Sequence, residues 1–317
     1  MPAVDPDRSE NGTSKGPHDF LGRIASAPIS WGICEVPGWG AMLPTPRVLG
    51  EMSSLGLPAT ELGAPGFLPE RPEELRALLG SVDMSLIGGF TPLVMHDRAL
   101  RSATLEAARR TARLFQECGA TMLVSAIVMD EQWSVPRPLE PDERRQVFDM
   151  LRAVDEICGE YGVQQVLHPH VQTVVETRDD VERVLDGCDV HWCLDTGHLA
   201  IGGVDPVAFA REAGERVGHV HLKDVNLAKA PAVLDRSVSI MSAVQSGLFT
   251  PLGQGDVPIA DVVETLERQG YRGWYVIEQD TALTAGLPPD GAGPITQVRT
   301  SLDYLREVVA PRLSAAR

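Results

Sequence analysis

Short apolar runs alternate along the chain with longer segments whose apolar residues recur at helical spacing. The short runs have the length and composition of buried strands. They cover residues 23–30, 59–63, 84–90, 121–127, 163–170, 190–197, 217–224 and 273–280. Because a helical segment follows nearly every one of these eight runs, the pattern predicts an α/β fold. The strands would form a parallel sheet closed as a (β/α)8 TIM barrel.

The helical segments carry recognisable end signals. Helices are predicted over residues 44–56, 103–119, 141–162, 180–187, 205–214, 259–270 and 294–313. In the first, we expect Thr45 to be the N-cap and Pro46 the first helical residue, and Gly119 should end the second. The connection after the seventh strand, residues 225–256, is too long for a simple loop. We expect an extended insertion of a short helix and loops over the mouth of the barrel.

An open, doubly wound sheet would also alternate strands and helices. It is disfavoured because no GxGxxG motif follows the first strand and because polar residues cluster at many strand ends. No linker divides the chain, so residues 23–317 are predicted to form a single barrel domain. Residues 1–22 lack an apolar core and a basic start, and are expected to be a disordered tail and not a signal peptide.

Composition narrows the classes of function. Of the 317 residues, 43% are hydrophobic and 23% charged, as in soluble globular proteins. No run of about 18 apolar residues is present, so no membrane span is expected. The net charge of −16 disfavours nucleic acid or anionic lipid as a partner, because it would repel phosphate groups. Five cysteines without a CxxC pair indicate free thiols in a reducing cytoplasm, where we expect the protein to act.

Residues of metal-ligand type stand at the ends of four consecutive predicted strands. The C-terminal ends of parallel barrel strands face one common pocket. The residues at these ends are His168 and His170; Asp195 and His198; His219, His221 and Asp224; and Glu278, Gln279 and Asp280. Buried carboxylates without a partner are costly, and a divalent cation compensates them. We therefore predict one divalent metal ion, with Mn²⁺ favoured and Co²⁺, Mg²⁺, Fe²⁺ or Zn²⁺ as alternatives.

Each of these residues also has a simpler interpretation. Asp195 could cap the helix that follows it, and a lone histidine at a strand end is often only hydrogen-bonded. In the HxH sequence of the seventh strand, both imidazoles point to one face, and His219, one layer deeper than His221, is the more structural of the two. The coincidence on four adjacent strands favours the metal, with Asp195 as a ligand. His198 would then hold Asp195, bind substrate or move a proton.

Several segments resemble the sugar isomerase/epimerase superfamily of xylose-isomerase-like TIM barrels. The resemblance runs from about residue 23 to the C-terminal end and is carried by "HWCLDTGHLA", "HVHLKDV" and "GYRGWYVIEQD". The segments "APISWGICEVPGWG" and "LHPHVQTVVET" are most similar to its inosose dehydratase (2-keto-myo-inositol dehydratase) branch. The resemblance implies a catabolic enzyme of inositol or another carbohydrate, and a homo-oligomer, either a dimer or a tetramer.

The resemblance also implies a ligand set. Members of the superfamily bind one divalent metal through Glu, Asp, His and Glu from strands five to eight. Carried over, this set is His168, Asp195, His221 and Glu278. His168 stands in the usual place of the first Glu, so His168 or His170 could be the ligand. We favour His168 as the ligand and place His170 at the substrate.

This departure from the superfamily pattern bears on the reaction. The resemblance implies that epimerases of this class use two carboxylate bases, one on each face of the sugar carbon. The loss of the strand-five Glu removes one of these bases. Glu176 could replace it, but its segment could equally begin the next helix. Elimination needs only one base and one acid. The sequence therefore favours a metal-dependent lyase, a dehydratase that removes water from a keto-inositol or related keto-sugar through an enediolate. A ketose isomerase or epimerase on the same scaffold is the alternative.

Candidate roles follow for the residues near the predicted pocket. Glu278 or a nearby histidine would take the α-proton of the substrate. His198, His170 or a Lys223/Asp224 pair would then protonate the leaving hydroxyl. The candidate substrate-binding residues are Trp31, Glu61, His96, Lys223 and Asp224. Three of these have a simpler alternative: Trp31 as a core aromatic, Glu61 in a hydrogen bond inside the barrel, and Lys223 as the ion-pair partner of Asp224.

Two other classes of function are disfavoured. A nuclease similar to endonuclease IV would need several metals and basic loops for phosphates, which the charge of −16 opposes. A catalytically silent barrel that only binds a sugar would have lost Asp195, His221 or Glu278, and all three are present. The predicted partner is therefore a small polyol or keto-sugar that the protein converts.

Overall fold

The computed structural model of the chain describes residues 20–315 and contains a closed barrel of eight parallel strands. The strands are β1 (Ile24–Ser26), β2 (Ala59–Glu61), β3 (Ser85–Leu93), β4 (Met122–Ile127), β5 (Gln164–Leu167), β6 (His191–Asp195), β7 (Val217–Leu222) and β10 (Tyr275–Ile277). Because β1 pairs in parallel with both β2 and β10, the sheet has no free edge. The predicted barrel is confirmed, and the alternative of an open sheet is wrong.

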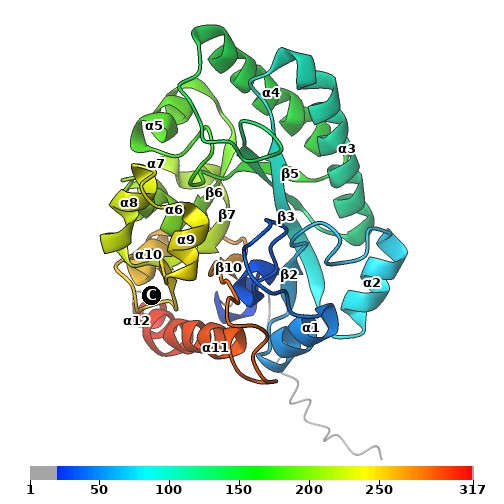
Figure 1. Cartoon of the computed structure of the whole chain (residues 1–317), viewed down its shortest axis with the longest axis vertical. Coiled ribbons are helices and arrows are strands. Elements are labelled where there is room, and N and C mark those ends of the chain that lie inside the picture. The colour runs from blue at the N-terminus through cyan, green and yellow to red at the C-terminus, as the bar shows by residue number, and fades with distance from the viewer. Residues whose placement is uncertain (1–19, 316–317) are drawn as a thin grey trace, which may run out of the picture.

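Helices surround the barrel and follow one another around it in chain order (Figure 1). They are α1 (Thr45–Ser54), α2 (Pro72–Gly80), α3 (Arg101–Cys118), α4 (Pro141–Glu160), α5 (Arg178–Gly187), α6 (Thr196–Ile201), α7 (Pro206–Ala213), α8 (Ala230–Leu234), α9 (Ile240–Gln245), α10 (Ile259–Arg268), α11 (Pro294–Tyr304) and α12 (Ala310–Ala315). A π-helical turn, Leu305–Val309, joins α11 to α12. None of the described helices is long and apolar enough to cross a membrane.

Some local predictions need correction. Pro44, not Thr45, is the N-cap of α1, and Thr45 is the first helical residue. The Thr45 hydroxyl donates to the carbonyl of Phe67 and does not cap the helix. Gly119 ends α3 in the left-handed conformation at φ 76°, as predicted. The helix α2 was not predicted at all. Its nine residues are short for a periodicity signal, although Pro at its start and two acidic residues in its first turn are helix-start signals.

The N-terminal end of the described chain is anchored to the barrel. Residues 1–19 of the predicted disordered tail lie outside the described part. Residues 20–22 were also assigned to the tail, but Phe20–Arg23 form a 3₁₀ helix. The ring of Phe20 packs edge-on against Tyr275 with centroids 5.2 Å apart, and Arg23 forms a 2.6 Å ion pair with Glu267. Ordered structure therefore includes Phe20 and does not begin at Arg23.

Alternation along the strands separates an outer core from the barrel interior. On β6, Trp192 faces outward and packs against Phe209 of α7, with ring centroids 5.3 Å apart. Cys193 faces inward and packs with Val124 and Val166. Because side chains alternate along a strand, Asp195 lies on the same inner face as Cys193, one layer higher. All five cysteines of the chain lie among the described residues and are free, as predicted.

The insertion after β7 contains two short helices, α8 and α9, and an antiparallel pair of strands, β8 (Asp224–Val225) and β9 (Phe249–Thr250). The predicted helix-and-loop insertion is confirmed. Gln245 of α9 donates to the carbonyls of Gly38 and Trp39 in the loop after β1. At the other side, Arg236 forms an ion pair with Glu176 in the loop after β5. The insertion thus bridges loops that leave the C-terminal ends of two separate barrel strands.

One buried carboxylate ties the two ends of this insertion together. Asp224 is 1% exposed, and its oxygens accept hydrogen bonds of 2.8–3.0 Å from four backbone N–H groups. The donors belong to Val225 at the start of the insertion and to Gly253, Gly255 and Val257 at its end. The side chain of Asp224 therefore holds the two ends of the insertion after β7 together.

We predict that Asp224→Ala lowers the free energy of unfolding by about 3 kcal/mol, because it leaves buried N–H donors without an acceptor. Urea unfolding followed by circular dichroism would measure this change. Asp235→Ala is the matched control, because Asp235 is an exposed acid of the same insertion that accepts one bond from Ser237. Equal urea midpoints for the two variants would contradict the role assigned to Asp224.

Candidate metal centre

Four side chains from four adjacent strands converge at the mouth of the barrel. They are His168, which follows β5, Asp195 at the end of β6, His221 on β7 and Glu278, which follows β10. One donor atom from each lies within 4.8 Å of the others. His168 Nε2 is 3.1 Å from Asp195 Oδ2, and His221 Nδ1 is 2.8 Å from Glu278 Oε2. The exposure of the four residues does not exceed 8%, so water reaches the cluster poorly.

Asp195 has two functions in this arrangement. Its Oδ1 accepts 2.8 Å hydrogen bonds from the backbone N–H groups of Gly197 and His198, and so caps α6. Its Oδ2 faces the cluster, 3.1 Å from His168 and 3.6 Å from His221. The two interpretations of Asp195, as a helix cap and as a member of the polar cluster, are compatible because each uses a different oxygen.

The ring of His221 supplies the strongest indication of a cation site. Its Nε2 lies 2.9 Å from Glu61 Oε1 and donates to it, so in a neutral ring Nδ1 carries a lone pair. That lone pair faces Glu278 Oε2, which is also an acceptor and lies 3.1 Å from the Lys223 ammonium, while Nδ1 has no hydrogen-bond partner among the described residues. Two acceptors 2.8 Å apart repel each other unless a proton or a metal ion lies between them. The donor set therefore fits a cation.

Lys223 provides part of the positive charge at the cluster. Its ammonium is 1% exposed and lies 2.8 Å from Asp280, 3.1 Å from Glu278 and 3.6 Å from Asp195. Burial alone would lower the pKa of Lys223, but these carboxylates raise it well above its ordinary value. The carboxylates near Lys223 outnumber its one ammonium, so an excess of negative charge remains that a cation would offset.

A proton is the alternative occupant of the gap beside His221. Burial alone would lower the pKa of His221, but Cys193, Glu278 and Glu61 raise it well above its ordinary value. Without a metal, the ring therefore carries a second proton, on Nδ1. A metal ion bound at Nδ1 must displace this proton.

Two further histidines lie beside the cluster without joining it. His170 donates from Nδ1 to the carbonyl of Val171, and its ring centroid is 3.8 Å from that of His198. Burial, followed by the neighbouring His168, lowers the pKa of His170 to about 3. His198 Nε2 lies 3.1 Å from the Lys223 ammonium. Of the two candidate strand-five ligands, only His168 reaches the other three residues of the cluster.

Several predicted substrate contacts lie elsewhere. Trp31 has no exposed surface and donates to Glu51 at 2.8 Å, so it is a core aromatic. His96 lines a surface hollow together with Arg137 and Glu143 at the start of α4, and no member of the cluster lines that hollow. The structure therefore does not bring these two residues to the cluster: Trp31 ends a 3₁₀ helix in the core, and His96 lies in the loop after β3.

The contacts of Lys223, Asp224 and Glu61 bear on the other predicted substrate-binding residues. Lys223 and Asp224 do not form a pair, because Asp224 binds the insertion while Lys223 points to the cluster. Glu61 is 2% exposed and hydrogen-bonds to His219 and His221, which favours its interpretation as a bond inside the barrel over a substrate contact. His219, expected to be the deeper and more structural histidine, has no exposed surface.

Two aromatic residues near the cluster were not predicted. Phe90 of β3 stacks on Trp133, with ring centroids 5.9 Å apart, and lies 5.7 Å from both His168 and His170. Both aromatic side chains are half-buried, so they form an apolar wall beside the strand-five histidine. Phe90 ends a predicted strand and could have been found from its position. Trp133 lies in the loop after β4, where no periodicity indicates the direction of a side chain.

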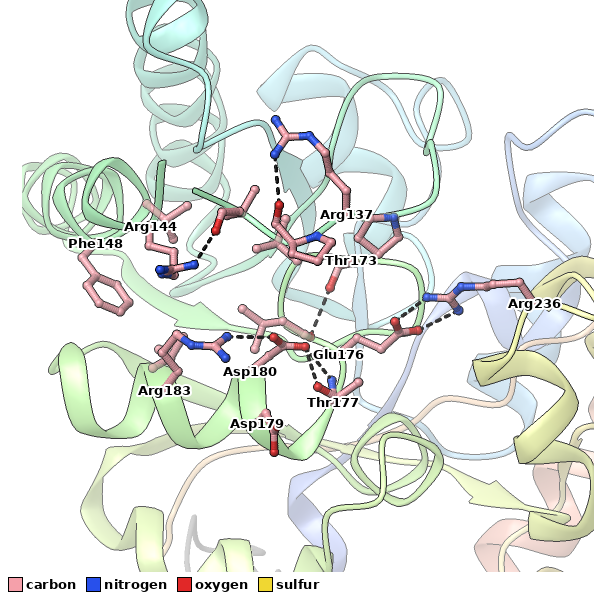
Figure 2. A pocket seen from close by; sticks show the side chains of 17 residues that line it. Arg137, Arg144, Phe148, Thr173, Glu176, Thr177, Asp179, Asp180, Arg183 and Arg236 are labelled. Atoms are coloured by element: carbon pink, nitrogen blue, oxygen red, sulfur yellow. Dashed lines mark hydrogen bonds and ion pairs between the residues drawn. The ribbon is translucent and has the colours of Figure 1, made fainter. Parts of the chain in front are cut away.

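A cavity of about 310 Å³ lies between the loops after β4 and β5 and the helices α4 and α5, and none of the four cluster residues lines it. Figure 2 shows the carboxylate of Glu176 facing the guanidinium of Arg236 there. Glu176 also accepts a 2.7 Å hydrogen bond from the backbone N–H of Gln172. Glu176, which the sequence suggested as a replacement for the strand-five carboxylate, is thus held in an ion pair.

The fold and the position of the cluster define a (β/α)8 barrel with a polar site at the C-terminal strand ends, where active sites of such barrels lie. The chain belongs to the xylose isomerase-like TIM barrel family, whose model matches residues 49–308. The resemblance inferred from the sequence is thereby confirmed.

Individual relatives cover nearly the whole chain. The inosose dehydratase of Geobacillus kaustophilus (strain HTA426) is 31% identical over 305 residues, which are 92% of this chain and 96% of that protein. The rhizopine catabolism protein MocC of Rhizobium meliloti is 32% identical over 306 residues, with 93% and 91% covered. The structure of L-ribulose 3-epimerase aligns with a TM-score of 0.67 at 16% identity over 93% of this chain and 97% of that one, which shows a common fold.

We predict that Asp195→Ala weakens Mn²⁺ binding by at least about 100-fold, because a ligand is lost together with its charge. Titration against a chelating dye would measure the affinity. Asp205→Ala is the matched control, because Asp205 caps α7 through the same two-donor geometry but lies outside the cluster. Unchanged metal binding in Asp195→Ala would exclude the centre.

Metal affinity should also rise with pH. Because the pKa of His221 is raised, its second proton must leave before Nδ1 can bind a metal. For one displaced proton, the affinity increases about tenfold per pH unit below that pKa. Calorimetry in buffers of different ionisation enthalpy would detect the released proton. An affinity that is constant between about pH 6 and about pH 8, with no proton release, would contradict this assignment.

Proposed function

We propose that the protein is a metal-dependent hydro-lyase that dehydrates a keto-inositol or a closely related keto-sugar. The opposed acceptors His221 Nδ1 and Glu278 Oε2, 2.8 Å apart beside Asp195, carry the metal part of this proposal. The relatives named inosose dehydratase support the dehydratase part, because they are similar over nearly the full chain.

His168, Asp195, His221 and Glu278 would hold the ion, and a mixed set of imidazoles and carboxylates suits Mn²⁺, with Fe²⁺, Co²⁺, Mg²⁺ or Zn²⁺ as alternatives. When bound, a divalent ion supplies Lewis acidity that makes the proton beside a substrate ketone easier to remove. The protein supplies a site that excludes water, which strengthens electrostatic interactions inside it.

The residues around the cluster provide the base and the acid of an elimination. Glu278 is the candidate base: its carboxylate lies at the mouth and accepts the α-proton, which leaves an enediolate. On the same side, the Lys223 ammonium links His198 and Asp280 through contacts of 3.1 and 2.8 Å. These three hydrogen-bonded side chains can hold a proton and deliver it to the leaving hydroxyl, which departs as water. His170 is disfavoured as the second candidate donor, because its pKa of about 3 leaves the ring neutral and its N–H donates to the carbonyl of Val171.

The arrangement of carboxylates favours elimination over epimerisation. Epimerisation by two opposed bases would need a second free carboxylate facing Glu278. Glu176 is held by Arg236 and the N–H of Gln172, and Glu61 is held by two imidazoles. The ketose isomerase or epimerase thus remains the second candidate, with the fold shared with L-ribulose 3-epimerase as its support.

Incubation of the Mn²⁺-loaded protein with keto-inositols and keto-sugars tests the reaction. We expect loss of water from a keto-inositol, seen as a product that absorbs in the ultraviolet and is lighter by one water molecule. Protein stripped by a chelator should lose this activity and regain it with Mn²⁺. Isomerisation or epimerisation without water loss would establish the second candidate and refute the dehydratase.

Glu278→Gln should suppress exchange of the substrate α-proton with deuterated water by about 100-fold or more, because the base is lost while the side chain keeps its size. Nuclear magnetic resonance of the substrate measures the exchange. Because Glu278 is also a proposed ligand, the comparison is made at equal bound Mn²⁺, determined for each sample. Full exchange in the loaded variant would assign the base to another residue.

A further inference from the structure

Beneath the metal cluster, one carboxylate binds two imidazoles inside the barrel. Glu61, at the end of β2, reaches across the interior to β7, where His219 and His221 point to the same face. Its Oε1 accepts from His219 Nε2 at 2.8 Å and from His221 Nε2 at 2.9 Å. Glu61 is 2% exposed and both histidines have no exposed surface. These three residues are called the Glu61 triad below.

We interpret the Glu61 triad as hydrogen-bonded because both imidazoles meet the same oxygen atom, Oε1, at the lengths of ordinary N–H···O hydrogen bonds. One shared oxygen serves both histidines as an acceptor without an ion between them. A carboxylate that accepts from two imidazoles must itself lack a proton, so both Nε2 atoms carry hydrogen.

When His221 is neutral, as it must be to bind a metal, it stands between two carboxylates that compete for its single proton. Glu61 faces Nε2 at 2.9 Å, and Glu278 faces Nδ1 at 2.8 Å. A neutral imidazole has only one N–H group. If that proton were on Nδ1, it would bind Glu278 and occupy the position of the metal, and the lone pair of Nε2 would point at Glu61.

We propose that Glu61 is a positioning residue of the metal centre: it holds the proton of His221 on Nε2, so that the Nδ1 lone pair faces Asp195 and Glu278. This inference rests on the proposed metal centre. His219 has a supporting function, because its bond to the same oxygen fixes the carboxylate of Glu61. Partners of this kind, one shell beyond the ligands, set the tautomer and orientation of a metal-binding imidazole.

The test compares two variants of Glu61. Glu61→Gln keeps the size and one acceptor oxygen but loses the charge, and Glu61→Leu removes the acceptor. We expect Mn²⁺ affinity, measured by competition with a chelating dye, to fall about tenfold in the first and about 100-fold in the second. If Glu61 controls the tautomer, Glu61→Gln should keep part of the Mn²⁺ affinity that Glu61→Leu loses. If Glu61 only fills space, the two variants should bind Mn²⁺ equally well, because leucine also fills the space.

The matched control is Glu51→Gln, because Glu51 is another buried glutamate that accepts from a ring N–H, that of Trp31, away from the cluster. Its metal affinity should equal that of the wild type. Circular dichroism establishes that each variant is folded, and Glu61→Gln serves alone if Glu61→Leu does not fold. In Zn²⁺-loaded, ¹⁵N-histidine-labelled protein, the hydrogen-bonded Nε2–H signal of His221 should be present in the wild type and shifted in the Glu61 variants.

The possible outcomes separate this inference from the proposed function. If the wild type binds no Mn²⁺, the metal centre itself is refuted. If the wild type binds Mn²⁺ and both Glu61 variants bind it equally well, the centre stands and the positioning role of Glu61 is refuted. Two ions per wild-type chain and one per Glu61→Leu chain would make Glu61 a ligand and would likewise overturn the inference.

Discussion

Negative charge enclosed within the barrel is the constraint on which the site depends. Asp195, Glu278 and Asp280 lie at most 9% exposed within reach of a single buried ammonium, that of Lys223. Desolvation of a carboxylate costs several kcal/mol unless opposite charge or hydrogen bonds offset it. Lys223 and the cap of α6 offset part of this cost, and a cation beside His221 would offset the remainder.

Closure of the sheet makes this concentration of charge possible. The ends of β5, β6, β7 and β10 are neighbours in a ring, so one inward-facing residue from each strand reaches a common point. The interior below contains small apolar side chains such as Val124 and Val166 as well as the Glu61 triad, and the mouth above is bridged by the insertion that Asp224 ties together. The surrounding fold thus keeps water away from the groups that would carry out the chemistry.

The sequence predicted the barrel and the four converging residues because both depend on regular periodicity. Each of the eight predicted strand runs overlaps a barrel strand, and each cluster residue lies at or within one residue of a strand end. Prediction failed where the direction of a side chain is set by tertiary contacts. Trp31 belongs to a 3₁₀ turn in the core, His96 follows three residues after β3, and Trp133 lies in an irregular loop. The bonds of Glu61 span 158 and 160 positions, which local patterns cannot reveal.

Asp195 takes part both in the polar cluster and in the start of the helix α6. Its Oδ1 holds the backbone N–H of His198 at 2.8 Å, while its Oδ2 faces the cluster. An ion bound at Oδ2 would act on the same carboxylate whose Oδ1 fixes the first turn of α6, and this turn carries the imidazole of His198. The proposed ligand and the start of that helix are therefore coupled through a single side chain.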